Sequence, residues 1–256
     1  MDRQPLTDRL GDRLLAEYGG ASAAYSFRAL NGNGDSVVRV RRSSDDAEQD
    51  FTAAEVSDGT LESFCGVGDG FVVRIYDQSG NGKDLINTTN AQQRKIVDTG
   101  VLVTEGGEPA LAGNAFAYFF SSSVSVSGNF SVLYLANFPA VSTGILGDDT
   151  AANRIRVQGE TLEVVDGSST EVNFNNLDNP PTFHTFDGSR VLLGLYRNGS
   201  SLTATLAGQV SAISPLTLSG GFTWKKAFAY GGGAGGGQQP MDSKFQELII
   251  WNSDIR

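Results

Sequence analysis

The sequence is poor in the residues that form covalent and metal cross-links: its 256 residues include one cysteine, Cys65, and one histidine, His184. A disulfide within the chain needs a second cysteine, and a Cys/His zinc site needs about four such ligands, so neither can form from this chain alone. A cysteine–histidine catalytic pair would require these two residues to meet. The composition therefore predicts no cofactor, with calcium as the alternative because calcium uses oxygen ligands.

Basic residues and long apolar runs are also scarce. Nineteen Lys and Arg residues against 29 Asp and Glu residues give a formal net charge of −10, which repels a phosphate backbone or an anionic membrane surface. No stretch approaches the roughly 20 apolar residues of a membrane span, and the first residues lack the basic start and apolar run of a signal peptide. The sequence argues against nucleic acid as a partner and against membrane insertion, and it predicts synthesis in the cytoplasm.

Glycine, in contrast, is abundant: 32 glycines are well above the roughly 7% that is average for proteins. The pairs Asp166-Gly167, Asp187-Gly188 and Asn198-Gly199 favour tight hairpins, because these residues adopt positive φ readily. Runs of β-branched and aromatic residues between such turns predict short antiparallel strands. We expect strands at residues 71–76, 130–138, 154–158, 161–165, 191–197, 202–206, 226–230 and 245–251. The sequence predicts an all-β antiparallel β-sandwich, in which only residues 46–64 have a possible helical pattern.

A short helix is expected before the first strand. Leu6, Leu10, Leu14 and Leu15 have helical spacing, and Gly19-Gly20 would end the helix. We therefore divide the chain into an N-terminal helical segment, residues 1–23, and a sandwich domain, residues 24–256. A helix of about 14 residues is marginal alone in water, so its apolar stripe must pack either on the sandwich or on an assembly partner.

Three segments together resemble a known family: Ala24-Tyr-Ser-Phe-Arg-Ala-Leu30, residues 38–51, and Arg74-Ile-Tyr-Asp-Gln-Ser-Gly-Asn-Gly-Lys-Asp-Leu85. They are similar to the concanavalin A-like, laminin G-like modules of phage tail and other virion proteins and of bacterial surface proteins, and residues 245–253 resemble the last strand of that module. The resemblance implies a concanavalin A-like jelly roll in a virion-associated structural or decorating protein of tail or capsid. It also implies other virion proteins as partners, a homo-oligomer, and host-surface carbohydrate as a ligand.

The Tyr-Asp-Gln-Ser-Gly-Asn-Gly signature also resembles the catalytic domain of arabinofuranosidase B-type enzymes. A retaining glycosidase uses two carboxylates about 5 Å apart. The glycine-rich loop that matches the acid/base segment of those enzymes, residues 231–237, contains no carboxylate, and the nearest matches to the nucleophile are Asp148 and Asp149. We therefore expect no catalytic residues and a non-catalytic protein. The alternative is a glycoside hydrolase of arabinofuranosidase type that acts on surface polysaccharide.

Asp77, Ser79 and Asn81 place oxygen-bearing side chains at alternate positions before Gly82, as at the start of a calcium-binding loop. The twelfth position is Thr88, which cannot supply the bidentate carboxylate of that loop. We expect a structural turn in which Asp77 binds backbone amides, with calcium binding as the alternative.

Flat aromatic side chains can stack on sugar rings, although most aromatic residues of a sandwich are buried. The candidates for stacking are Tyr118, Phe119, Phe120, Trp224 and Tyr230. As ligand-binding residues we expect Asp148, Asp149, Trp224 and Tyr230.

Overall fold

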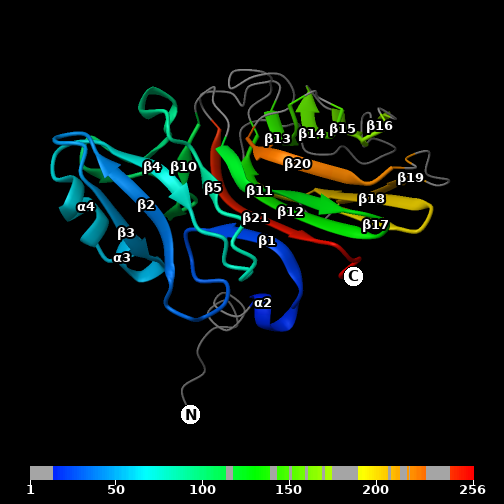
Figure 1. Ribbon diagram of the computed structural model, residues 1–256, viewed down its shortest axis with the longest axis horizontal. Helices are drawn as coiled ribbons and strands as arrows, with labels where there is room; N and C mark the ends of the chain where they lie inside the picture. Colours follow the sequence, from blue (N-terminus) through cyan, green and yellow to red (C-terminus); the bar gives the residue numbers. More distant parts are fainter. Residues whose placement is uncertain are drawn as a thin grey trace, which may run out of the picture.

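The protein is a β-sandwich with a lobe at one end, as Figure 1 shows. The structure, a computed structural model, describes residues 14–113, 118–138, 143–149, 152–158, 161–168, 171–174, 190–206, 209–213, 218, 220–228 and 243–256. Two antiparallel sheets form the sandwich, and the described helices are short, which confirms the predicted fold class. None of the described helices has the length and apolar character that crossing a membrane would require.

One layer is a seven-stranded sheet in the order β1-β21-β12-β17-β18-β19, with β10 paired to β21. Its strands are β1 (Ala21–Ser26), β10 (Leu111–Ala112), β12 (Phe130–Asn137), β17 (Arg190–Asn198), β18 (Ser201–Leu206), β19 (Gln209–Ile213) and β21 (Lys244–Trp251). The first and last strands of the chain are neighbours in this sheet, so the two ends of the described chain close the fold together.

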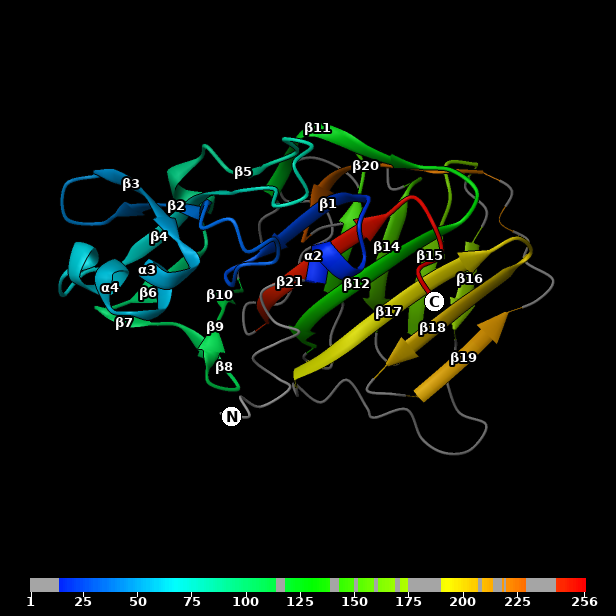
Figure 2. The ribbon, with the colours of Figure 1, turned by 90° about the horizontal axis from the view of Figure 1, so that it is seen from below.

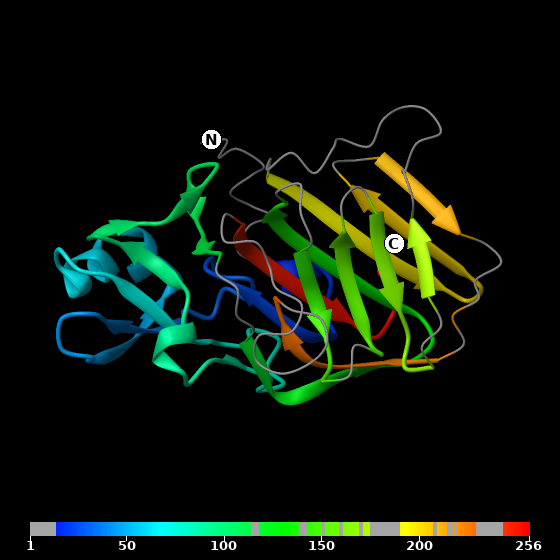
Figure 3. The ribbon, with the colours of Figure 1, turned by 90° about the horizontal axis from the view of Figure 1, so that it is seen from above.

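The other layer is a twelve-stranded sheet in the order β16-β15-β14-β13-β20-β11-β5-β4-β2-β3, with β6 paired to β4 and β7 to β6. Its strands are β2 (Ser36–Arg42), β3 (Glu48–Thr52), β4 (Gly70–Ile75), β5 (Leu85–Ile86), β6 (Lys95–Asp98), β7 (Val101–Leu102), β11 (Tyr118–Val126), β13 (Thr143–Gly147), β14 (Arg154–Gln158), β15 (Thr161–Val165), β16 (Glu171–Phe174) and β20 (Phe222–Ala227). Half of this sheet covers the seven-stranded layer, and the light-green strands in Figure 3 lie in front of the yellow and red ones.

The remaining strands of the twelve-stranded sheet extend beyond the sandwich and form the lobe, which we define as residues 36–102 (Figure 2). The lobe also contains α3 (Ala53–Ser57), α4 (Thr60–Cys65) and the short 3-10 helix η1 (Asn90–Gln92). A capping box between Thr52 and Glu55 starts α3 directly after β3. The helical pattern expected over 46–64 therefore begins with a strand and becomes helical only at residue 53. A small hairpin, β8 (Thr104–Glu105) and β9 (Glu108–Pro109), follows the lobe.

Apolar residues from both sheets fill the space between the layers. Trp224 and Phe222 of β20 stack on each other with ring centroids 5.2 Å apart, and Phe130 of β12 meets Phe222 edge-on at 5.2 Å. These rings are almost completely buried, and their contacts join the two sheets at the centre of the sandwich.

A second apolar cluster lies on the opposite face of the seven-stranded sheet, beneath α2 (Leu14–Glu17). Leu14 and Leu15 pack there against a group that includes Ile249 and Trp251, and the Trp251 indole donates a hydrogen bond of 2.9 Å to the Tyr18 carbonyl. The described turn of the N-terminal helix therefore packs on its own sandwich. The first strand begins at residue 21, inside the segment expected to be helical, and residues 1–13, with Leu6 and Leu10, lie outside the described residues.

Candidate functional site

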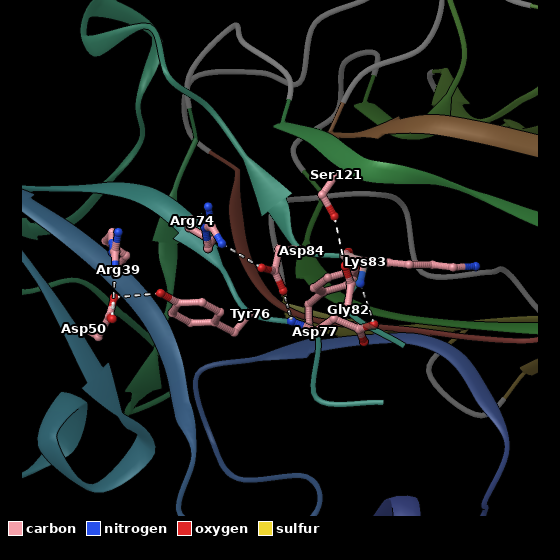
Figure 4. Close-up of polar contacts among 10 residues, drawn as sticks. Arg39, Asp50, Arg74, Tyr76, Asp77, Gly82, Lys83, Asp84 and Ser121 are labelled. Atoms are coloured by element: carbon pink, nitrogen blue, oxygen red, sulfur yellow. Dashed lines mark hydrogen bonds and ion pairs between the residues drawn. The ribbon is translucent and has the colours of Figure 1, made fainter. Parts of the chain in front are cut away.

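The turn that follows β4 joins the lobe to the edge of the other sheet (Figure 4). The Asp77 carboxylate accepts hydrogen bonds from the backbone amides of Ala24, at 2.9 Å, and of Ser79 and Lys83, both at 3.0 Å. The hydroxyl of Ser79 donates a further bond to it at 2.9 Å. Two of the segments that define the family resemblance, 24–30 and 74–85, are therefore bound directly to each other.

The other two residues of the possible calcium loop also form hydrogen bonds within the turn. Ser79 Oγ accepts from the Asn81 side chain at 3.0 Å, and the same Asn81 amide donates to the Ala21 carbonyl at 2.8 Å. In the described part of the chain, no group of three or more acidic, histidine or cysteine side chains could hold a metal ion. The contacts of Asp77, Ser79 and Asn81 support a structural turn.

A row of paired residues crosses the outer face of the twelve-stranded sheet. Phe119 of β11 points outward, because its neighbours Tyr118 and Phe120 are buried in the core. Side chains that are paired across antiparallel strands share a face. Phe119 is paired with Lys226 on one side and Ile86 on the other, and the row continues in both directions. In order, the row contains Asp50, Arg39, Arg74, Ile86, Phe119, Lys226 and Gly147.

A groove of about 300 Å³ opens beside this row, where β5 meets β11. It is lined by Ile86, Asn87, Thr88, Thr89, Gln92, Phe119, Phe120 and Ser121. The exposed fraction of Phe119 is 36%, and the surrounding side chains are mostly amides and hydroxyls. A partly exposed ring among short polar groups suits a ligand that has both an apolar face and many hydroxyls.

Asp148 and Asp149 lie at the end of β13, and their side chains have different partners. Asp148 is buried and accepts a hydrogen bond of 2.8 Å from the Asn153 amide. Asp149 accepts a hydrogen bond of 2.8 Å from Lys225, which lowers the pKa of the Asp149 carboxyl, and the neighbouring Lys226 charge lowers it further. The Lys226 ammonium is 3.5 Å from the second oxygen of Asp149. Asp149 is therefore ionised at neutral pH and lies next to the row.

The structure corrects one expected ligand-binding residue. The Trp224 side chain is fully buried in the core, where its ring is unavailable to a sugar. A register shift between β11 and β20 explains the arrangement, because it puts Trp224 inside, opposite Val124, while Lys226 pairs with the outward Phe119. Tyr118 and Phe120 are also buried, so Phe119 is the exposed ring among the described candidates. Tyr230 and the glycine-rich loop 231–237 lie outside the described residues.

Sequence reasoning did not identify the polar side chains of the groove or Lys226. The polar run Asn87-Thr-Thr-Asn90 directly after the strand β5 was an available signal, since hydroxyl and amide clusters at strand ends often form binding loops. Lys226 gave no such signal, because its position depends on the register shift.

The fold is similar to that of solved arabinofuranosidases. A GH54 α-L-arabinofuranosidase soaked with a cyclic sulfate inhibitor matches 95% of this chain with a TM-score of 0.59 and 17% sequence identity. An arabinofuranosidase complexed with arabinofuranosyl-α-1,2-xylobiose matches 94% with a TM-score of 0.56 and 14% identity. This chain covers 62% and 61% of those two chains, so it spans about three fifths of their length. At this identity the likeness establishes a shared fold.

No protein-family model matches the sequence, and no curated protein matches it either. The structural likeness agrees with the resemblance to arabinofuranosidases, and it gives no support to the resemblance to phage modules. What the likeness establishes is the β-sandwich fold alone.

Proposed function

We propose that this chain is a glycan-binding domain whose ligand occupies the groove beside Phe119. The observation that supports this most directly is the groove's lining, in which one exposed aromatic ring is surrounded by the side chains of Asn87, Thr88, Thr89, Gln92 and Ser121. Aromatic faces stack on the apolar face of a sugar, and amides and hydroxyls exchange hydrogen bonds with its hydroxyl groups. The fold shared with arabinofuranosidases is consistent with this proposal.

The binding proposal is tested with a glycan array followed by calorimetry on the best ligand. Phe119→Ala should weaken binding about tenfold, because a lost stacking contact of about 1.4 kcal/mol corresponds to that factor. The matched control is Leu192→Ala, which removes an exposed apolar side chain from the other sheet. Equal affinity of Phe119→Ala and the unchanged protein would place the ligand elsewhere.

A glycoside hydrolase is the second candidate, favoured by the structural likeness to arabinofuranosidases. Asp149 is an ionised carboxylate at the end of β13, which a nucleophile requires. The charged groups that shift its pKa among the described residues are lysines, whereas a retaining enzyme needs a second carboxyl about 5 Å away. Because residues 231–237 also contain no carboxylate, we favour binding without hydrolysis.

Hydrolysis is tested with 4-nitrophenyl α-L-arabinofuranoside, a compound soaked into one of the similar arabinofuranosidases. We expect no release of nitrophenol above the rate of a heat-denatured sample. Release that disappears in Asp149→Asn, while the variant keeps its melting temperature, would establish the enzyme instead.

We also propose that the chain is a component of a virion, and this part of the proposal rests on the sequence resemblance alone. As a homo-oligomeric tail or capsid protein, the chain would present its groove to host-surface carbohydrate. Mass spectrometry of purified particles should then find the chain, and light scattering should find an oligomer. A monomer that is missing from the particles would contradict this setting.

A further inference from the structure

A groove of about 480 Å³, which we call the outer groove, lies on the outer face of the seven-stranded sheet beside the hairpin of β8 and β9. Figure 2 looks onto this face, with α2 in front of it. Glu247 of β21 and Leu135 of β12 are paired across the sheet and both line the outer groove. Leu14 of α2 and Pro109 of β9 add apolar side chains to it. It shares no lining residue with the groove beside Phe119, which lies on the other sheet.

Gln246 gives the outer groove a buried acceptor that has no donor. The pairing of β12 with β21 skips Gln246, which is therefore the extra residue of a β-bulge and lines the outer groove together with Glu247. Its side-chain nitrogen donates to three carbonyl oxygens of the hairpin at 3.0 to 3.3 Å. The reverse orientation of the amide would put its oxygen against those three oxygens, so the contacts turn Oε1 away from the hairpin. The exposed fraction of Gln246 is 4%, and Oε1 has no hydrogen-bond partner. Buried acceptors are satisfied in most proteins, so a donor is missing from the outer groove.

Two oppositely charged side chains of the outer groove have no partner in the described part of the chain. The Glu247 carboxylate is bound by Arg28 through two hydrogen bonds, of 2.8 and 3.1 Å. In contrast, the exposed side chains of Arg190 and Glu108 form neither a hydrogen bond nor an ion pair with a described residue. Both lie at the hairpin: Glu108 belongs to β9, and a Cβ on Gly106 would lie 3.0 Å from Nη1 of Arg190. The hairpin therefore brings an unpaired cation and an unpaired anion close together at the edge of the outer groove.

We propose that the outer groove binds a free α-amino acid with an apolar side chain, such as leucine. Its carboxylate pairs with Arg190, and its ammonium donates to Gln246 Oε1 and to the Glu108 carboxylate. Its side chain packs on Leu135 and Pro109. A free amino acid carries both charges on one carbon, which matches the closeness of the unpaired cation and anion. A neutral sugar would leave both charges unpaired. This site is separate from the proposed glycan site and does not depend on it.

The test is calorimetry of the whole chain with leucine and with three compounds that each lack one of its features. Leucinamide lacks the carboxylate, N-acetyl-leucine lacks the ammonium, and glycine lacks the apolar side chain. We expect leucine to bind about tenfold more tightly than each of the three, because each loses either a charge-assisted hydrogen bond or an apolar contact. Equal affinities for leucine, leucinamide and N-acetyl-leucine would overturn the inference, and so would a chain that binds no leucine.

Two exposed residues provide variants that should fold normally, because neither has a partner to lose. Arg190→Gln should weaken leucine binding about tenfold and make the affinities for leucine and leucinamide equal. Glu108→Gln should reduce the preference for leucine over N-acetyl-leucine. The control is Lys225→Gln, an exposed lysine of β20 in the other sheet, which should bind leucine as the unchanged protein does. Leucine binding that Arg190→Gln leaves unchanged would contradict the inference. A glycan that lost affinity in Arg190→Gln would make the outer groove a sugar site instead.

Discussion

Asp77 shows how one carboxylate can hold a turn of one sheet against the edge strand of the other sheet. It accepts three hydrogen bonds from backbone amides and one from a hydroxyl, and one of the amides belongs to β1 in the other sheet. Tyr25 of β1 donates to the Lys83 carbonyl at the far end of the same turn. Since backbone amides of a tight turn have no other partners, the carboxylate replaces the water that would otherwise solvate them.

Replacing Asp77 with alanine should lower the free energy of unfolding by about 2–3 kcal/mol, since hydrogen bonds to charged groups contribute about 1.5–3 kcal/mol each and are not additive. Urea denaturation measures this change. Asp45→Ala is the control, because it removes an exposed carboxylate whose ion pair with Arg42 is screened by solvent, and it should change the stability far less than Asp77→Ala. The melting temperature should be the same with calcium and with a chelator. A calcium-dependent increase that Asp77→Ala abolishes would make this turn a calcium site.

At the scale of elements, alternation of residue types predicted some strands well and misplaced others. In β14, Ile155 and Val157 alternate with arginines, and the expected bounds 154–158 agree with the structure. In β20, alternation would place Trp224 and Lys226 on one face, but the register shift against β11 separates them. The strand also begins four residues earlier than the expected 226. A register shift depends on pairing between distant strands, so a local pattern cannot reveal it.

The helix α2 has a testable role in the fold. Leu15 packs on the cluster around Trp251, and its backbone amide donates to the Leu30 carbonyl at 3.1 Å. Leu15→Ala should lower the free energy of unfolding by about 1–2 kcal/mol, less than for a fully buried leucine because Leu15 is half-buried. Val67→Ala, at a highly exposed position of the lobe, should have no measurable effect. Unchanged stability together with a loss of oligomers in Leu15→Ala would mean that the leucine stripe binds a partner instead.

At the scale of the whole molecule, the lobe and the sandwich share the twelve-stranded sheet. They are also joined by hydrogen bonds between residues 24–30 and the side chains of Asp77 and Gln78. The segments 24–30 and 74–85, which carry the sequence resemblance, contact each other through Asp77 and Gln78, two side chains of the motif. The groove could not be predicted in this way, since it forms where β5 meets β11, and those strands are more than 30 residues apart in the chain. The chemistry of the groove is readable from its residue types only after their positions are known.

The central link between lobe and sandwich is Gln78, a buried side chain. Its carbonyl oxygen accepts from the Leu30 amide at 2.7 Å, and its amide donates to the carbonyls of Ser26 and Arg28, both at 3.0 Å. Gln78→Leu keeps the approximate size but leaves these three backbone groups without partners, so we expect a loss of about 2–4 kcal/mol. Asn31→Ala is the matched control, because it removes a longer bond of 3.3 Å to the backbone carbonyl of Gln78 and an exposed bond from the Asn33 amide.

Because the shared sheet connects the two parts, we expect Gln78→Leu to destabilise both of them equally. Hydrogen exchange of the Val72 and Ile75 amides reports on β4 in the lobe, and tryptophan fluorescence reports on Trp224 and Trp251 in the sandwich. Both signals should give the same free energy of unfolding, in the unchanged protein and in the variant. If β4 instead exchanged at a lower free energy than the sandwich in the variant, Gln78 would stabilise the lobe alone, and the two parts would be separate folding units.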